Sequence, residues 1–220
     1  MSKILPIDQG NKVMKQDHNI RVVLFDLGNV LVDLGDISEM HAMLNTQGEE
    51  SAVWLKWLSS PTVAAFDSGE ITFDQFADRL LKEVGSNIDK ETFKASFKAW
   101  PRGLFAGALE LVESVKPEYH RAILSNTNAA HWPRLMDEMA LAGKFHSYYA
   151  SHLIGYVKPD EAIYQHVIRN LQVSPEQILF IDDNQVNIDA ANRLGMQAYR
   201  VKGVDEARLV LHQHGVLSNA

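Results

Sequence analysis

Two apolar stretches of this chain end directly on acidic residues. Val22–Phe25 leads into Asp26, and Ile178–Ile181 leads into the adjacent pair Asp182 and Asp183. A strand that delivers an aspartate to its carboxyl end can present a nucleophile or a metal ligand, although a lone aspartate there can equally cap a turn. Two neighbouring carboxylates repel each other, and a hard divalent cation would offset that repulsion.

Polar residues also follow a third apolar stretch, Ala122–Leu124. Ser125 supplies a hydroxyl and Asn126 a backbone N–H, and such groups at a junction of strand and helix suit a phosphate oxygen. The same residue types are common in ordinary turns. Further along, Lys158 precedes Pro159. A lysine is usually solvated, but one held near an aspartate nucleophile would keep that carboxylate charged and neutralise a bound phosphate.

The elements that must position these residues alternate between strands and helices. Such alternation predicts an α/β fold with a doubly wound, Rossmann-like parallel sheet. Val186, Ala190 and Leu194 mark one helix face, and Ser174–Gln177 has the capping-box pattern of a helix start. The expected strands are Val22–Phe25, Ala122–Leu124, Ile178–Ile181 and Ala198–Val201, with Tyr148–Ser151 as a weaker fifth.

Residues 37–102 interrupt this alternation, because they contain no convincing strand. Thr72 and Gln75 form a capping box that predicts a helix start, and apolar residues recur at helical spacing around it. We expect a small helical bundle with an aromatic core. Its stripes are Ile37, Met40, His41 and Leu44; Trp54 and Leu58; Phe73, Phe76, Ala77, Leu80, Leu81 and Val84; and Phe93, Phe97 and Trp100.

The composition narrows the function classes. The 220 residues carry a net charge of −7 and no cysteine, which excludes disulfides and cysteine chemistry and fits a cytoplasmic protein. The acidic balance argues against nucleic-acid binding, and no apolar run approaches the roughly 20 residues of a membrane span. We expect residues 1–19 to form a tail, residues 20–36 and 103–220 a core domain, and residues 37–102 an inserted domain.

Taken in chain order, Asp26, Ser125, Lys158–Pro159 and Asp182–Asp183 resemble the four motifs of the haloacid-dehalogenase-like (HAD) superfamily. They span residues 22 to about 190, which is most of the chain. The sequences of Phe25–Val30, Leu124–Asn128 and Phe180–Asn184 are similar to those of the subgroup containing bacterial α-D-glucose-1-phosphate phosphatases. They are also related to the phosphatase domain of soluble epoxide hydrolase. The resemblance implies that the helical insert is a cap that closes over the site.

The resemblance also implies roles for the strand-end residues. Asp26 would attack phosphorus and form an aspartyl-phosphate, while Ser125 and the backbone N–H of Asn126 would bind the phosphoryl oxygens. Lys158 would neutralise the charge on the nucleophile and the phosphate. The substrate would be a small phosphorylated metabolite, with neither a nucleic acid nor a membrane as partner; the oligomeric state stays open.

A Mg²⁺ ion is the cofactor that the resemblance implies. Asp183, with help from Asp182, would hold the metal together with Asp26 and the backbone carbonyl of Gly28. The ion would offset repulsion between an anionic nucleophile and an anionic substrate.

Gly28 departs from the pattern of most of these phosphatases, which carry an aspartate there as general acid and base. The main hypothesis is a Mg²⁺-dependent phosphatase of small phosphomonoesters, with sugar phosphates as the expected class. Because Gly28 removes the acid–base group, a weakly active or inactive phosphate- or partner-binding protein is the alternative. A 2-haloacid dehalogenase is a further alternative, against which the pair Asp182–Asp183 argues.

Overall fold

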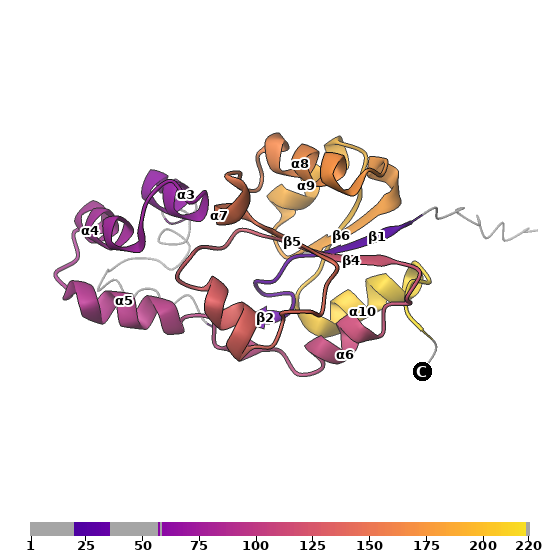
Figure 1. The fold of residues 1–220 in the computed structure, drawn as a ribbon, viewed down its shortest axis with the longest axis horizontal. Helices are drawn as coiled ribbons and strands as arrows, with labels where there is room; N and C mark the ends of the chain where they lie inside the picture. Colours follow the sequence, from indigo (N-terminus) through magenta and orange to yellow (C-terminus); the bar gives the residue numbers. More distant parts are fainter. Residues whose placement is uncertain (1–19, 36–56, 58, 219–220) are drawn as a thin grey trace, which may run out of the picture.

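The computed structural model describes residues 20–35, 57 and 59–218 of the chain (Figure 1). The tail expected at residues 1–19 and the helical stripes expected at residues 37–44 and at Trp54 and Leu58 lie outside the described residues. Within the described part, none of the helices is long and apolar enough to cross a membrane.

A five-stranded parallel sheet forms the centre of the fold, as the alternating pattern predicts. Phe25 at the end of the first strand is opposite Ile123 on one side and Ile181 on the other, so the residues that follow these three emerge at the same edge. The weaker fifth strand is confirmed as an edge strand. In spatial order the strands are β5 (Ser147–Ala150), β4 (His120–Ser125), β1 (Val22–Phe25), β6 (Ile178–Asp182) and β7 (Gln197–Arg200).

Helices cover both faces of this sheet (Figure 1). Successive side chains of β1 point to opposite faces, so Val23 and Phe25 join one hydrophobic cluster while Val22 and Leu24 join the other. Each fully buried side chain of this size contributes roughly 1.5–3 kcal/mol relative to an exposed one. The first cluster includes residues of α6 (Ala108–Glu113) and α10 (Gly203–Gln213), and the second includes residues of α8 (Glu161–Leu171) and α9 (Gln185–Arg193).

Three helices lie to one side of the sheet and share a hydrophobic cluster of their own (Figure 1). They are α3 (Pro61–Asp67), α4 (Phe73–Val84) and α5 (Lys90–Ala99). Thr72 caps α4 through the reciprocal bonds with Gln75 that the capping box predicts. Phe66 and Phe76 stack with ring centroids 4.3 Å apart in the middle of this cluster. We refer to residues 57 and 59–102 as the helical segment.

A short antiparallel ribbon joins the helical segment to the rest of the chain. It pairs β2 (Val32–Asp33) with β3 (Gly103–Leu104), and the sequence pattern gives no sign of strands this short. Trp100 at the end of α5 also donates from Nε1 to the Leu34 carbonyl at 2.8 Å. The chain therefore leaves the core after β2 and returns to it at β3, and these two points lie side by side.

Two helical expectations need correction. The capping box at Ser174 is present, but it starts only the single 3₁₀ turn Pro175–Gln177, because the apolar run at Ile178 continues into β6. In α9 the predicted face is wrong at Val186, which is 56% exposed. The buried side of α9 consists of Asn187, Ile188, Ala190 and Ala191, since polar Asn187 is drawn inward by a buried carboxylate.

Candidate active site

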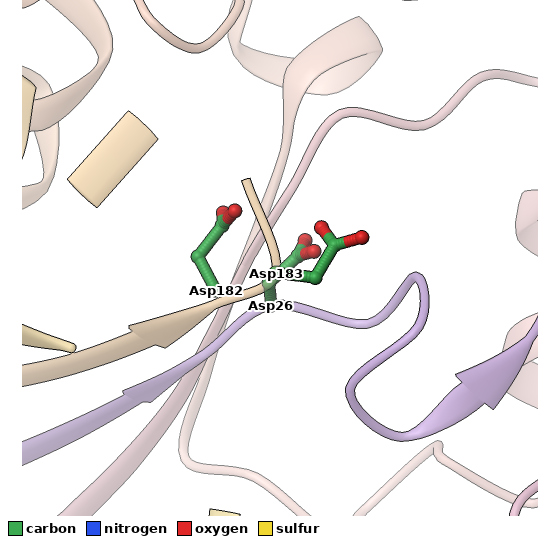
Figure 2. A group of neighbouring side chains, drawn as sticks. All are labelled: Asp26, Asp182 and Asp183. Carbon is green, nitrogen blue, oxygen red and sulfur yellow. The ribbon is translucent and has the colours of Figure 1, made fainter. Parts of the chain in front are cut away.

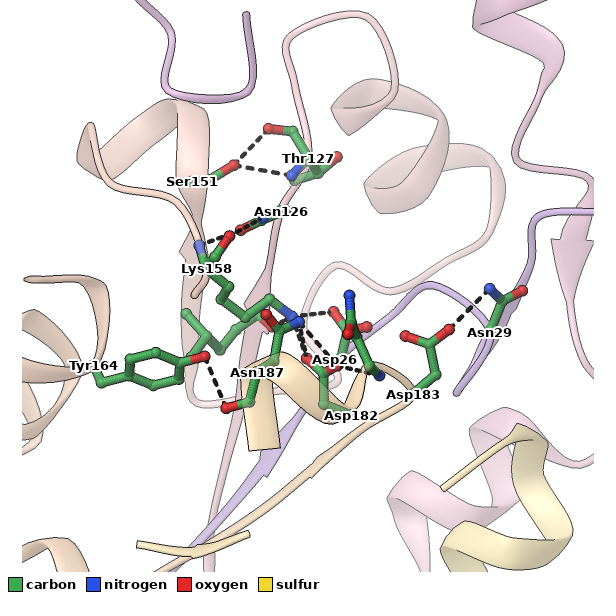
Figure 3. A network of polar contacts seen from close by, with 12 residues as sticks. Asp26, Asn29, Asn126, Thr127, Ser151, Lys158, Tyr164, Asp182, Asp183 and Asn187 are labelled. Atoms are coloured by element: carbon green, nitrogen blue, oxygen red, sulfur yellow. Dashed lines mark hydrogen bonds and ion pairs between the residues drawn. The ribbon is translucent and has the colours of Figure 1, made fainter. Parts of the chain in front are cut away.

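Lys158 lies at the centre of a buried charge network at the carboxyl edge of the sheet (Figure 3). Its Nζ is 2.8 Å from Asp26 Oδ1 and 2.5 Å from Asp182 Oδ2, and it also donates to the Leu124 carbonyl at 3.1 Å. Burial alone would lower the pKa of Lys158, but the charges of Asp182 and Asp26 raise the pKa above its ordinary value. The lysine therefore stays charged, and its hydrogen bonds link the carboxyl ends of β1, β4 and β6.

Asp182 is fully buried, and hydrogen bonds surround its carboxylate. Oδ1 accepts from the Asn184 backbone N–H at 2.8 Å and from Asn187 Nδ2 at 3.0 Å, while Oδ2 accepts from Lys158. Asn187 is in turn fixed by Tyr164, whose hydroxyl donates to its backbone carbonyl at 3.1 Å. A buried charge needs such complete pairing.

Asp26, Asp182 and Asp183 form the one acidic cluster in the described part of the chain that could hold a metal ion (Figure 2). One oxygen from each lies within 4.8 Å of the others. Burial raises the pKa of Asp26 to about 7, which Lys158 opposes and the other two carboxylates reinforce. Burial also raises the pKa of Asp183, against a 3.0 Å hydrogen bond from Asn29 Nδ2. Three carboxylates face a single lysine, so a hard divalent cation suits this donor set.

The loop after β4 is fastened to the segment that carries Lys158. The Asn126 side chain accepts from the Lys158 backbone N–H at 2.8 Å and donates to the Lys158 carbonyl at 2.9 Å. At the next residue of the loop, the Ser151 hydroxyl accepts from the Thr127 backbone N–H at 2.9 Å and donates to the Thr127 carbonyl at 2.8 Å (Figure 3). Ser125, the last residue of β4, is buried beside this loop and lines the cavity above Asp26.

Gly28 follows the nucleophile candidate by two residues, and Leu34 occupies the neighbouring space. A Cβ atom built at Gly28 would lie 2.9 Å from Leu34 Cδ1. Position 28 therefore carries no titratable group, and an apolar side chain borders it.

A cavity of about 580 Å³ opens above these residues, between the sheet edge and the helical segment. Its wall includes Asp26, Ser125 and Lys158 from the core and Asp67 from α3. Aromatic and aliphatic side chains make up much of the rest, among them Leu34, Trp57, Val63, Phe97, Trp100 and Val186. Such a mixture of apolar walls and a few convergent polar groups is typical of a small-molecule site.

The profile of the haloacid dehalogenase-like hydrolases matches residues 20–195 of the sequence. The chain belongs to this family. Among curated members it is 25% identical over 189 residues to D-ribitol-5-phosphate phosphatase of Bacteroides thetaiotaomicron, an alignment that covers 82% of this chain and 91% of the relative. It is 24% identical over 203 residues to glyceraldehyde 3-phosphate phosphatase of Methanopyrus kandleri, with coverage of 83% and 84%.

A solved structure of the HAD family has the same fold. The enzyme comes from Bacteroides thetaiotaomicron and was crystallised with magnesium and inorganic phosphate. It superposes with a TM-score of 0.67 at 23% identity, over 83% of this chain and 94% of that one. The family membership predicted from the four motifs is therefore confirmed, together with the α/β fold.

The structure brings all the strand-end residues of the HAD motifs to one edge of the sheet. Asp26, Ser125, Lys158 and Asp183 all line the same cavity, whereas Asp182 lies beneath it. Two contributors escaped the sequence analysis. Asn187 lies inside the helix predicted from Val186, Ala190 and Leu194, and nothing in that pattern marks it as a partner of Asp182. The position of Asp67 in the cavity depends on how α3 packs against the core, which the sequence does not reveal.

Proposed function

We propose that this protein is a Mg²⁺-dependent phosphatase that hydrolyses small phosphomonoesters, with sugar phosphates as the substrate class. The observation that carries the proposal is Lys158 Nζ lying between Asp26 and Asp182, which form a cluster of three carboxylates together with Asp183. Phosphoryl transfer to a carboxylate needs positive charge at this point, because nucleophile and substrate are both anionic. The names of the two curated relatives support the substrate class.

In the proposed reaction Asp26 is the nucleophile. Its Oδ1 is held by Lys158, so the carboxylate has a fixed direction towards the cavity. Attack on phosphorus forms an aspartyl-phosphate, which water then hydrolyses. Lys158 favours the ionised form of the carboxylate and so opposes the effect of burial on its pKa.

The phosphoryl oxygens would be held by the loop after β4. The Ser125 hydroxyl and the Asn126 backbone N–H are the donors that we assign to them. The Asn126 side chain has a separate task, because its two bonds to the Lys158 backbone fix the distance between this loop and the lysine. Preorganised donors of this kind stabilise developing negative charge without reorganisation.

The acidic cluster fits Mg²⁺, a hard cation that prefers carboxylate and carbonyl oxygens. Asp26, Asp183 and the Gly28 carbonyl would supply the protein ligands. Asp182 would contribute indirectly, since Lys158, Asn184 and Asn187 already engage its oxygens. When bound, the ion would neutralise phosphoryl charge beside the nucleophile.

The decisive experiment is a phosphate-release assay on the purified full-length protein with MgCl₂ and a panel of sugar, polyol and nucleoside phosphates. We expect turnover of at least one substrate, loss of activity in Asp26→Asn, and retained activity in the exposed control Asp137→Asn. No phosphate from any substrate, or equal activity in Asp26→Asn, would refute the proposal. Binding of Mg²⁺ and phosphate without turnover would instead favour the non-catalytic binding protein that Gly28 suggests.

A further inference from the structure

The carboxyl group of Asp67 lines the cavity but takes no part in the network around Lys158. Asp67 is the last residue of α3 and lines the cavity from the helical segment, on the side away from the sheet. Its Oδ1 accepts from Asn128 Nδ2 at 3.0 Å, and Asn128 lies on the loop that follows β4. Among the described residues no donor binds Oδ2. An acidic side chain of the helical segment is thus held against the loop expected to bind phosphate.

The surroundings of Asp67 move the pKa of its carboxyl group towards neutral pH. Burial raises the pKa of Asp67 to about 6, and the hydrogen bond from Asn128 opposes the rise only in part. The titratable groups on the core segments that pack against α3 are His131 and His152, and burial lowers the pKa of both. The charged residues of α4, which packs against α3, all occupy exposed positions: Asp74, Asp78, Arg79, Lys82 and Glu83.

The other titratable groups of the cavity are less suited to exchanging protons with a substrate. Lys158 is kept charged by its two carboxylates. His131 has a pKa of about 4 because of burial, and its Nε2 must carry the proton because it faces the Phe97 carbonyl at 2.7 Å. Asp160 is exposed at the start of α8. Gly28 has no side chain to offer.

We propose that Asp67 is the catalytic residue that exchanges protons with the leaving group and with water. This inference rests on the proposed phosphatase function. In the first step an Asp26 oxygen bonds to phosphorus, the bond from phosphorus to the ester oxygen breaks, and the Asp67 proton passes to that oxygen. In the second step water attacks the same phosphorus, one water proton returns to Asp67, and the bond to Asp26 breaks. The products are the alcohol and inorganic phosphate, and both aspartates regain their starting forms.

The test compares Asp67→Asn with Glu70→Gln, which removes an exposed carboxylate three residues away. With an alkyl phosphate, whose leaving oxygen needs a proton, kcat/KM of Asp67→Asn should fall about 10²–10⁴-fold. With p-nitrophenyl phosphate, whose leaving group is stable as an anion, kcat/KM should fall less than tenfold. Because water activation is then slow, the variant should release a burst of nitrophenol close to one per site. Glu70→Gln should behave as wild type.

A second variant addresses the proton more directly. Asn128→Asp keeps the oxygen that accepts from the backbone N–H groups of Ala130 and His131, but it replaces the donor to Asp67 with an anionic oxygen. The pKa of Asp67 should rise, so the alkaline limb of kcat/KM for the alkyl phosphate should move to higher pH. Such a shift is not expected if Asp67 only holds the helical segment in place.

Three outcomes would overturn the inference. If wild-type protein turns over both substrates and Asp67→Asn matches it, Asp67 is not the proton carrier and the proposed function stands. An equal loss on both substrates without a burst would assign Asp67 a positioning role, again leaving the function intact. If wild-type protein hydrolyses neither these esters nor the wider panel, the proposed function and the inference fall together.

Discussion

The raised pKa of Asp67 has a consequence for stability that can be measured without any substrate. Asp67→Asn replaces the carboxyl group with a neutral one of the same shape that can still accept from Asn128. Since burial raises the pKa of Asp67 from 3.8 to about 6, the folded state binds the proton more tightly than the unfolded state does. The contribution of protonated Asp67 to the free energy of unfolding is therefore complete below pH 3.8 and is lost as the pH rises to about 6.

The size of this loss follows from the shift. Each pKa unit corresponds to about 1.36 kcal/mol, so a shift of about two units is worth at most about 3 kcal/mol. The Asp67 side chain is only partly buried because it borders the cavity, and water in the cavity would reduce this free-energy difference. We expect Asp67→Asn to raise the free energy of unfolding by about 1–3 kcal/mol at pH 7.5 and to change it little at pH 4.

Urea denaturation at both pH values, without added metal ion, measures this difference. Glu70→Gln serves as the matched control, because it removes an exposed carboxylate from the same turn. An Asp67→Asn effect of the same size at pH 4 and pH 7.5 would refute the reasoning, since the effect would then not come from the ionised carboxylate. A gain at pH 7.5 would mean that the protein retains Asp67 at the expense of stability, as is common for functional residues.

Three further predictions follow from contacts described above. Asn187→Ala strips two hydrogen bonds from the buried Asp182 carboxylate, so the free energy of unfolding should fall by about 1–3 kcal/mol in urea titrations; an unchanged value would contradict this. Gly69→Ala would place a Cβ 2.4 Å from the His152 carbonyl oxygen at φ +78°, so Tm should fall and KM should rise; an unchanged KM would show that this turn need not contact α7 (Ser151–Ile154). Phe76→Ala should lower the free energy of unfolding by about 3–5 kcal/mol, and a loss below 1 kcal/mol would refute the aromatic packing.

The sheet and the charge network could be predicted from the sequence because their signals are local. Each strand contains a short apolar run, and the side chains of Asp26, Ser125, Asp182 and Asp183 follow such runs directly. In a parallel sheet the carboxyl ends of neighbouring strands meet at one edge, so the juxtaposition of Asp26, Ser125 and Asp183 follows from topology alone. Lys158 needs the additional observation that a cation must balance these carboxylates.

The remaining features depend on long-range packing. Asp67 and Asn128 are 61 residues apart, and no spacing rule brings them together. The helix expected after Ser174 fails for a related reason, because pairing of Ile178 with Val22 of β1 overrides the local helix signal. The exposure of Val186 likewise reflects the contact of Asn187 with Asp182, which hydrophobic periodicity does not encode.

Gly28 and Gly69 differ in how open they are to evolutionary change. The atom that would meet a side chain at Gly28 is the end of the Leu34 side chain, which can rotate away. At Gly69 the obstacle is the backbone carbonyl of His152, and the residue's positive φ adds to the difficulty. A lineage could therefore acquire an acidic side chain at position 28 by a single substitution with local repacking, whereas position 69 is fixed by the main chain opposite. The acid–base group of the site can therefore change more easily in evolution than the contact between the helical segment and α7.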